Sequence, residues 1–351
     1  MTIETVKKLI ECCIQAPSAD NHQPLKYRYA DRIIHCSYDD ERVAGRTFSK
    51  EDPATLLAVG AAYENLLQAA QALGVNINAN RAPDTSDEFF DVKIDDNDAP
   101  KDFDLASHPI FLRHTNRNPF TPADNLTEVL KQLNFEDYPD AKPVAITDNE
   151  KISDVAALVQ QASLIRFETQ EVHEWLGKSI RYGKNREDKL DGLDINSLGL
   201  PPGGGLFMKL VLDWNRMQFL NRIGMSSIMA KIDAQPVAQA QALVAITGED
   251  SRQGAIRAGG VLTKVWGEIN SLGLAVQPYY VLSDLEQRLK TNGVPPKHRE
   301  SAKNICDSTK SILDIGSNQR LYMIFRIGKA KKEAVRSLRL PIESVFEDDS
   351  Q

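Results

Sequence analysis

The chain contains a weak internal repeat, here called the echo, between two distant segments of equal length. Residues 60–75 read GAAYENLLQAAQALGV and residues 259–274 read GGVLTKVWGEINSLGL, and the two align without a gap. Few residues are identical, but apolar residues recur in the same helical register, and each segment ends in Leu-Gly before an extended-looking run. A repeated unit constrains the whole fold, because each copy is expected to build the same local structure. The echo predicts two related halves folded against each other, with a site between them.

Composition excludes several classes of protein. The 351 residues allow one large domain or two moderate ones, and 42% hydrophobic with 26% charged residues is typical of a globular protein. A net charge of −7 argues against a nucleic-acid partner. Because no apolar run approaches the ~20 residues of a membrane helix, no membrane partner is expected. The four cysteines form no metal-like pair, and we expect buried free thiols and a cytoplasmic protein.

Strand and helix patterns mix without strict alternation, which predicts the α+β class. A helix is expected before Pro17, followed by a hairpin, and the acidic, proline-dotted stretch 95–109 is expected to separate the halves. Segment 179–206 is charged and then rich in Gly and Pro, which predicts a lid or a mobile loop. The other expected helices are 53–73, 124–133, 149–178, 206–229, the echo helix and 295–313, and the expected strands are 25–30, 32–38, 89–94, 142–147, 242–247 and 321–328.

The loop after the first helix reads APSADNHQP over residues 16–24. On its own this is an ordinary helix-ending turn, since most of its residues favour turns. The alternative is a ligand-binding loop. There, Ser18 and Asn21 would present a hydroxyl and an amide, and an amide suits a heterocycle edge because it both donates and accepts hydrogen bonds.

A second candidate reads RHTNRNPF over residues 113–120. These charges could simply be solvated at the surface. Alternatively, Arg113 and Arg117 flank Thr115 as a phosphate clamp, because guanidinium groups make planar, charged, two-pronged contacts with phosphate. Arg339, in the segment SLRLP, is a weaker candidate for the same role.

Familiar catalytic patterns are missing from the sequence. GGG at 203–205 lacks the lysine of a nucleotide phosphate loop, no GxGxxG occurs, and His173-Glu174 lacks the second histidine of a zinc protease helix. We therefore predict no metal. The catalytic residues stay unknown, and a site without obvious catalytic side chains indicates a cofactor that brings its own chemistry.

In this order the motifs resemble the nitroreductase-like flavoprotein superfamily. The superfamily has a helix, an APS-x-x-N-x-QP loop and a strand, an Arg-x-Ser/Thr-x-Arg-x-x-Phe phosphate motif, and a closing strand with Arg-x-Gly and a basic Arg-Leu-Pro segment. This chain matches with APSADNHQP, RHTNRNPF, FRIG and SLRLP. Leu25 replaces the usual aromatic residue after Gln-Pro, and the arginine motif lies in the middle of the chain instead of near its start.

The resemblance implies a nitroreductase-like fold in which one chain replaces the usual dimer. Central antiparallel sheets flanked by helices would form an intramolecular pseudo-dimer, with an N-terminal half 1–105 and a C-terminal half 106–351 that carries the lid and an extended C-terminal arm. One complete FMN site would form between the halves of a monomer. Its residues would be Pro17, Ser18, Asn21, Gln23, Arg113, Thr115, Arg117, Gln277, Pro278 and Arg339.

The function implied by the resemblance is FMN-dependent reduction of a small acceptor, such as a nitroaromatic or a quinone, by NADH or NADPH. Two alternatives remain open. The chain could sequester or store FMN beneath the lid, or it could be a flavin dehydrogenase of a biosynthetic intermediate. The acceptor and the choice between NADH and NADPH are not encoded in any recognisable residue.

Overall fold

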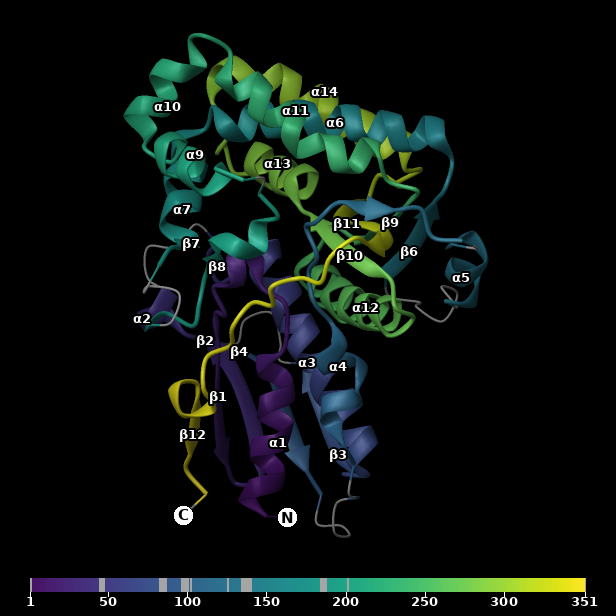
Figure 1. The fold of residues 1–351 in the computed structure, drawn as a ribbon. Coiled ribbons are helices and arrows are strands. Elements are labelled where there is room, and N and C mark those ends of the chain that lie inside the picture. The colour runs from purple at the N-terminus through teal and green to yellow at the C-terminus, as the bar shows by residue number, and fades with distance from the viewer. Residues whose placement is uncertain are drawn as a thin grey trace.

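The computed structural model describes residues 2–43, 48–81, 87–95, 101, 103–124, 126–133, 141–183, 188–200 and 202–350. Helices and two main sheets share these residues, which confirms the mixed α+β content that the sequence predicts. One sheet lies at the lower end of Figure 1 beside both chain termini, and the other lies in the upper part among most of the helices.

The first sheet contains the predicted hairpin. Its two-residue turn, Asp31 and Arg32, has φ of +48° and +65°, the left-handed geometry that hairpin turns of this length favour. Every pairing in the sheet is antiparallel except that of its last strand, which comes from the C-terminal arm. Across the sheet the order is β12 (Phe346–Asp348), β1 (Leu25–Ala30), β2 (Ile33–Tyr38), β4 (Glu88–Ile94) and β3 (Ile77–Arg81).

The second sheet repeats this order. Counted along the chain, each sheet sets its first, second, fourth and third strands side by side, with antiparallel pairing throughout. A long helix follows the second strand in both cases. The strands are β6 (Ala141–Ile146), β9 (Ala242–Glu249), β11 (Gln319–Ala330) and β10 (Ala275–Tyr279), and the short β5 (Phe120–Thr121) adds to β11.

The two echo helices pack against each other at the centre of the molecule (Figure 1). These are α3 (Pro53–Leu73), which has the predicted bounds, and α12 (Arg252–Ser271). Each helix joins the second strand of its sheet to the third, so the crossing places the two sheets on opposite sides of one helical layer.

Glycines allow these helices to approach closely. A Cβ on Gly60 would lie 1.7 Å from the carbonyl oxygen of Ile256, and a Cβ on Gly259 would lie 2.1 Å from that of Leu57. Ile256 lies three residues before Gly259, and Leu57 lies three residues before Gly60. Each helix therefore offers the same carbonyl position to the glycine of the other, and the two contacts are reciprocal. Reciprocal contacts characterise an interface with two-fold symmetry.

The remaining helices flank the sheets: α1 (Ile3–Ile14), α2 (Asp40–Val43) and α4 (Pro109–Leu112) lie beside the first sheet, and most of the others fill the upper part of Figure 1. In the described part of the chain, no helix has both the length and the apolar character needed to cross a bilayer. The others are α5 (Leu126–Gln132), α6 (Asn149–Phe167), α7 (Gln170–Ser179), α9 (Gly204–Val211), α10 (Trp214–Asn221), α11 (Met225–Ala238), α13 (Val281–Lys290) and α14 (Arg299–Ile312).

Two expected helices are shorter than predicted. The helix expected over 149–178 breaks into α6 and α7, because Thr169 has an extended backbone (φ −101°, ψ 109°). The helix expected over 206–229 is three helices, separated by Asp213, which caps α10, and by Gly224 at φ +90°. Apolar periodicity continues across such short breaks, so it overestimates helix length. Helix α13 was not predicted.

The C-terminal arm joins the second sheet to the first. It leaves β11, runs down the front of the molecule as the yellow trace in Figure 1, and ends in β12, which pairs in parallel with β1. The amide of Tyr27 donates to the carbonyl oxygen of Val345 at 2.7 Å. This path carries Arg339 to the loop after α1.

Candidate functional site

The loop after α1 is strained. Asp20, Asn21 and Gln23 have φ of +49°, +54° and +48°, a region that residues other than glycine rarely adopt. The Ser18 hydroxyl accepts a hydrogen bond from the amide of Gln23 at 3.0 Å and so braces the turn. Strain of this kind persists only where the surroundings hold it, and it concentrates at functional sites.

Asn21 ties this loop to two distant segments. Its side-chain nitrogen donates to the carbonyl oxygens of Gly192 and Leu338, each at 3.1 Å. Its side-chain oxygen accepts from Nη1 of Arg339 at 2.8 Å. Arg339 and Asn21, two of the predicted cofactor residues, are therefore in direct contact.

Gln23 connects the same two segments. Its Nε2 donates to the carbonyl oxygen of Leu190 at 2.9 Å, and its Oε1 accepts from the amide of Leu340 at 2.9 Å. Together, Asn21 and Gln23 place the loop between residues 190–192 of the predicted lid and residues 338–340 of the arm. Residues 190–192 were not among the predicted site residues, since only backbone groups make these contacts.

Two arginines meet at the end of α1. Arg113 and Arg339 both donate through Nη2 to the carbonyl oxygen of Gln15, at 2.7 and 3.3 Å. Arg113 is buried, and its guanidinium lies 4.7 Å from the centre of the Trp266 ring. The Nε atoms of Arg113 and Arg339 are buried without a hydrogen-bond partner in the described part of the chain. Two buried, unused N–H groups on neighbouring cations fit an anionic ligand.

The pKa shifts of Arg113 and Arg339 also favour an anionic ligand. Burial, with added repulsion from Arg339 and Arg336, holds the pKa of Arg113 well below its usual range. Burial also lowers the pKa of Arg339 to about 10. Every cause acting on these two groups disfavours their charged forms, so an added anion would be bound strongly there.

Arg117 lies in different surroundings from Arg113. It is half-buried and donates through Nη1 to the carbonyl oxygen of Ser197 at 3.3 Å. Burial lowers its pKa, while the charge of Asp20 opposes that shift. The structure thus sets Arg339, and not Arg117, beside Arg113.

Thr115, Gln277 and Pro278 approach from the second half. Thr115 forms a bridge to Val276, which fixes the 113–117 segment along the edge of β10. Gln277 Oε1 accepts from Nη1 of Arg326 at 2.7 Å, while Pro278 pairs with Phe325 in the sheet.

Arg326 was missed as a candidate. It is buried, its guanidinium lies 3.7 Å from the centre of the Phe120 ring, and its Nε has no hydrogen-bond partner among the described residues. Burial lowers its pKa. The only signal in the sequence is the Arg-x-Gly of FRIG, which the resemblance matched without assigning a role to the arginine.

Asp20 was also missed. Its carboxylate accepts from Nε1 of Trp175 at 2.7 Å, which links the loop to α7. Burial raises the pKa of Asp20, against the opposing effects of Trp175, Arg166 and Arg117. Nothing in the local sequence signals this contact, because 155 positions separate the partners.

The predicted lid, residues 179–206, lies against the loop. Residues 184–187 and 201 are outside the described residues. In the remainder, β7 (Ile180–Arg181) pairs with β8 (Leu193–Asp194), and Arg181 forms a largely buried ion pair with Asp191 at 2.7 Å. The amide of Gly192 donates to the carbonyl oxygen of Asn21 at 3.0 Å. This segment therefore covers the loop through specific contacts.

A small cavity lies beside the loop, on the side of α1, β1 and the arm. This cavity of about 20 Å³ is lined by residues of α1, the loop, β1 and the arm, including Ser18, Gln23 and Leu340, and half-buried Pro17 lies in the same loop. A drug-sized ligand typically needs ~300 Å³ or more. This cavity is therefore too small to hold a flavin ring as it stands.

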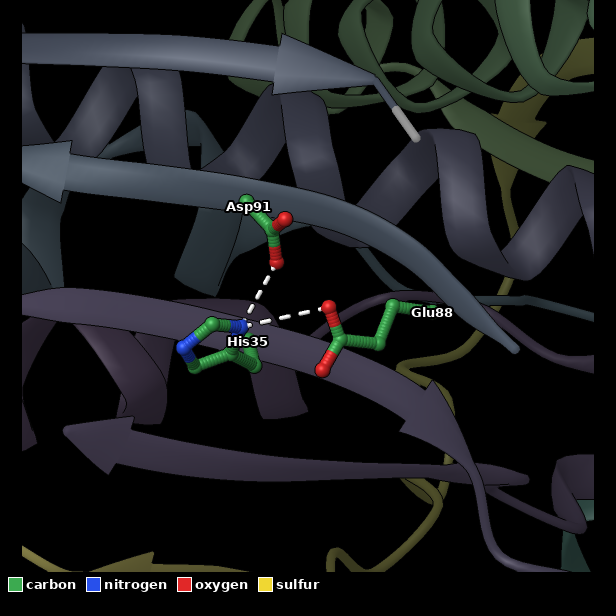
Figure 2. Close-up of side chains that lie close together, drawn as sticks. All are labelled: His35, Glu88 and Asp91. Atoms are coloured by element: carbon green, nitrogen blue, oxygen red, sulfur yellow. Dashed lines mark hydrogen bonds and ion pairs between the residues drawn. The ribbon is translucent and has the colours of Figure 1, made fainter. Parts of the chain in front are cut away.

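A separate cluster lies on the first sheet. Figure 2 shows His35 between two carboxylates: its Nδ1 is 2.8 Å from Asp91 and 3.2 Å from Glu88. The three ligand atoms lie within 4.8 Å of one another, close enough to share a metal ion, but Arg28 also approaches Glu88, at 3.9 Å. His35 and Asp91 are direct cross-strand partners. Cross-strand ion pairing accounts for the cluster without a metal ion.

Comparison with known proteins gives one curated similarity. The chain matches no protein-family model. It is 26% identical over 178 residues to the putative NAD(P)H nitroreductase acg of Mycobacterium tuberculosis, in strains CDC 1551 / Oshkosh and ATCC 25618 / H37Rv. The match covers 49% of this chain and 53% of each relative, so the chain spans about half the length of the curated relatives it matches. This similarity supports the resemblance to the nitroreductase-like superfamily.

Solved structures give weak similarities. The FMN and NADPH-dependent nitroreductase NfnB from sphigopyxis sp. strain HMH has a TM-score of 0.39 at 16% identity, over 69% of this chain and 97% of that one. Iodotyrosine deiodinase bound to FMN and 3-iodo-L-tyrosine has a TM-score of 0.35 at 13% identity, over 66% and 94%.

Proposed function

We propose that this chain is an FMN-dependent oxidoreductase of the nitroreductase type, which transfers reducing equivalents from NAD(P)H to a small acceptor such as a nitroaromatic or a quinone. One observation carries the proposal: Arg113 and Arg339 meet at the end of α1 with buried, unused Nε groups, next to the strained loop that bears Asn21. A phosphate-bearing ligand with a polar heterocycle fits both features.

The proposed architecture is an intramolecular pseudo-dimer, with related halves 1–105 and 106–351. Three observations support it: the matching strand order of the two sheets, the equivalent positions of α3 and α12, and the reciprocal contacts at Gly60 and Gly259. A tandem duplication accounts for all three. The protein we propose is a cytoplasmic monomer.

The proposed division of roles follows the distribution of charge. Arg113 and Arg339 bind the phosphate of FMN, and Thr115 and Arg117 assist from the same segment. Ser18, Asn21 and Gln23, following Pro17, present polar groups to the ring from the first half. Gln277 and Pro278 reach it from the second half, and Gln277 is oriented by its hydrogen bond from Arg326.

FMN, when bound, supplies the hydride chemistry. The protein binds and orients it, and it excludes water through residues 188–200, which lie over the loop. In this structure the side chain of Asn21 is hydrogen-bonded to Gly192, Leu338 and Arg339. Binding would exchange some of these contacts for ligand contacts, so cover and cofactor would be energetically linked.

A second candidate function is sequestration of FMN, and the contacts of the lid favour it. A cover fastened to Asn21 and Gln23 by several hydrogen bonds, and braced by the buried Arg181–Asp191 pair, would keep nicotinamide away from the flavin. The two functions differ only in whether this cover opens.

The test is anaerobic mixing of FMN-loaded protein with NADH and with NADPH, followed by flavin absorbance. An oxidoreductase should bleach as the intact chain. If bleaching appears only after residues 186–204 are replaced by a Gly-Ser linker, the chain sequesters FMN. If neither protein bleaches while FMN stays bound, the oxidoreductase proposal is wrong.

A further inference from the structure

Exposed apolar side chains gather on one part of the molecule. In the described part of the chain, the large apolar residues that are at least 47% exposed, apart from Leu338 of the arm, all lie in α9, in α10, in α11 or in the turn between α10 and α11. The least exposed of them is Leu210 at 47%, and Leu206 reaches 77%. We call these helices the cap. The six residues are Leu206, Leu210, Phe219, Ile223, Ile228 and Ile232.

The cap folds around a core of its own. Met208 and Val211 from α9, Met217 from α10 and Met229 from α11 are buried together in a small cluster. Because the buried faces converge on this cluster, the opposite faces point outward. In Figure 1 the three helices lie in the upper part of the molecule, away from both termini, and α11 lies alongside α6. The exposed apolar residues thus form an outer surface.

The charge of the cap is opposite to that of the chain. The cap, residues 204–238, contains four cations, all exposed, and two acids, whereas the whole chain has a net charge of −7. One acid, Asp233, is paired with Arg166 at 3.1 Å. Asp213 is occupied as the N-cap of α10, accepting from the amide of Arg216 at 2.9 Å. The cations alternate with the exposed apolar residues along all three helices; they are Lys209, Arg216, Arg222 and Lys231.

We propose that the cap docks on the surface of an anionic lipid bilayer. Helices with apolar side chains and interspersed cations on one face bind such surfaces by inserting the apolar groups while the cations meet the headgroups. No spanning helix is required. The expectation of no membrane partner rested only on the lack of such a helix, so it does not extend to peripheral contact.

Charge also argues against a second copy of the chain as the occupant. A symmetric dimer apposes the same patch on both subunits. Joining two caps would bring Lys209, Arg216, Arg222 and Lys231 close to their own counterparts, and like charges apposed at an interface oppose association. An anionic surface satisfies these cations instead.

The test is co-sedimentation with vesicles of phosphatidylcholine alone and of phosphatidylcholine mixed with phosphatidylglycerol. The chain should bind the anionic vesicles, bind neutral vesicles at least tenfold less, and lose binding as salt is raised. Equal binding to both vesicles, or to neither, would overturn the proposal.

Variants assign the binding to the cap. Arg216→Gln with Arg222→Gln should weaken binding about fivefold per charge removed. Phe219→Ser with Ile223→Ser should weaken it at least tenfold, because two large apolar side chains no longer insert. Leu272→Ser is the matched control, since Leu272 is 45% exposed but lies at the end of α12, and it should bind as the parent chain does.

Folding of each variant is checked by its melting temperature, which substitutions of exposed residues should leave nearly unchanged. Sedimentation equilibrium of the parent chain completes the test. A dimer that the Phe219→Ser, Ile223→Ser variant abolishes would show that a second copy covers the cap, and would overturn the lipid proposal.

Discussion

The connection between the first and second strands differs greatly between the two sheets. In the first sheet β1 turns into β2 through Asp31 and Arg32 alone, whereas in the second sheet residues 147–241 separate β6 from β9. The third and fourth strands of the second sheet are also far apart in the chain, since residues 280–318, with α13 and α14, separate β10 from β11. The two sheets share a framework, and the second carries large insertions in its connections.

This difference shows where the candidate site comes from. The insertion between β6 and β9 supplies residues 190–192, and the extension after β11 supplies Arg339; both contact the loop before β1. The corresponding stretch before β6, residues 134–140, lies outside the described residues. A shared framework with unequal connections is what a single site between two halves requires.

The largest expected effect tests the symmetric part of the comparison. Gly60→Ala and Gly259→Ala should each destabilise the fold by about 3 kcal/mol, because each new Cβ would meet a backbone carbonyl that side-chain movement does not relieve. Urea unfolding measures both. Losses of similar size would support a reciprocal crossing, and a large loss at only one glycine would contradict it.

Gly260→Ala is the matched control for this pair. It lies next to Gly259 in α12, but the nearest atom to its new Cβ, on Glu64, would be 3.6 Å away. Alanine is the better helix former, so this variant should be as stable as the parent or more stable by up to ~1 kcal/mol.

The next effect tests the asymmetric part. Arg113→Gln and Arg339→Gln should each weaken FMN binding by about 1.5–3 kcal/mol, or roughly one to two decades in Kd, because each removes a charged contact to phosphate. Calorimetric titration with FMN and with riboflavin separates this role from a structural one. Riboflavin lacks the phosphate and should lose much less affinity.

Arg117→Gln ranks the arginines against each other. Arg117 donates to Ser197 and lies within the electrostatic influence of Asp20, and it does not bind the Gln15 carbonyl oxygen that Arg113 and Arg339 both bind. Its replacement should therefore weaken FMN binding less than replacement of Arg339 does. A greater loss of FMN affinity in Arg117→Gln would support the Arg113–Arg117 phosphate clamp that the sequence predicts. Equal losses of FMN and riboflavin in all three variants would rule out a phosphate role.

The smallest effect concerns the caps of the two central helices. Asp52 caps α3 by accepting from the amide of Ala54 at 2.8 Å, and Ser251 caps α12 by accepting from the amide of Gly254 at 3.0 Å. Burial raises the pKa of Asp52 to about 6. The folded state therefore holds this proton at pH values where the unfolded chain, with a pKa of about 3.9, has lost it.

The contribution of Asp52 to stability should accordingly fall as pH rises from about 4 to about 6. Asp52→Asn keeps the cap and removes the charge, so it should equal the parent near pH 3.5 and exceed its stability by about 2 kcal/mol at pH 7.5. Ser251→Ala should lose about 1 kcal/mol at both pH values. A pH-independent effect of Asp52→Asn would contradict the burial of that carboxyl.

The sequence predicts the parts of the fold that depend on neighbouring residues. The bounds of α3 are marked by Pro53 and by Gly74 at φ +65°, and the hairpin alternates from Leu25 to Tyr38. The echo identified the two helices that cross, because helical register survives where identity does not. Lengths were overestimated where a break such as Thr169 leaves the apolar period intact.

The site was predicted in its parts but not in its connections. Ser18, Asn21, Gln23, Arg113 and Arg339 were all candidates, and the structure brings them to one place. The contact of Arg339 with Asn21 spans 318 positions and depends on the path of the arm, which has no periodic pattern. Arg326 and Asp20 were missed because their partners lie on other elements.

The central claim is that two unequal halves enclose one flavin site. The most direct measurement is the amount of FMN released by acid from saturated, washed protein, relative to protein concentration. The account predicts one FMN per chain, since the arginine pair and the Asn21 loop each occur once in the part of the chain that the structure describes. A reproducible value of two, or no retained FMN at all, would contradict it.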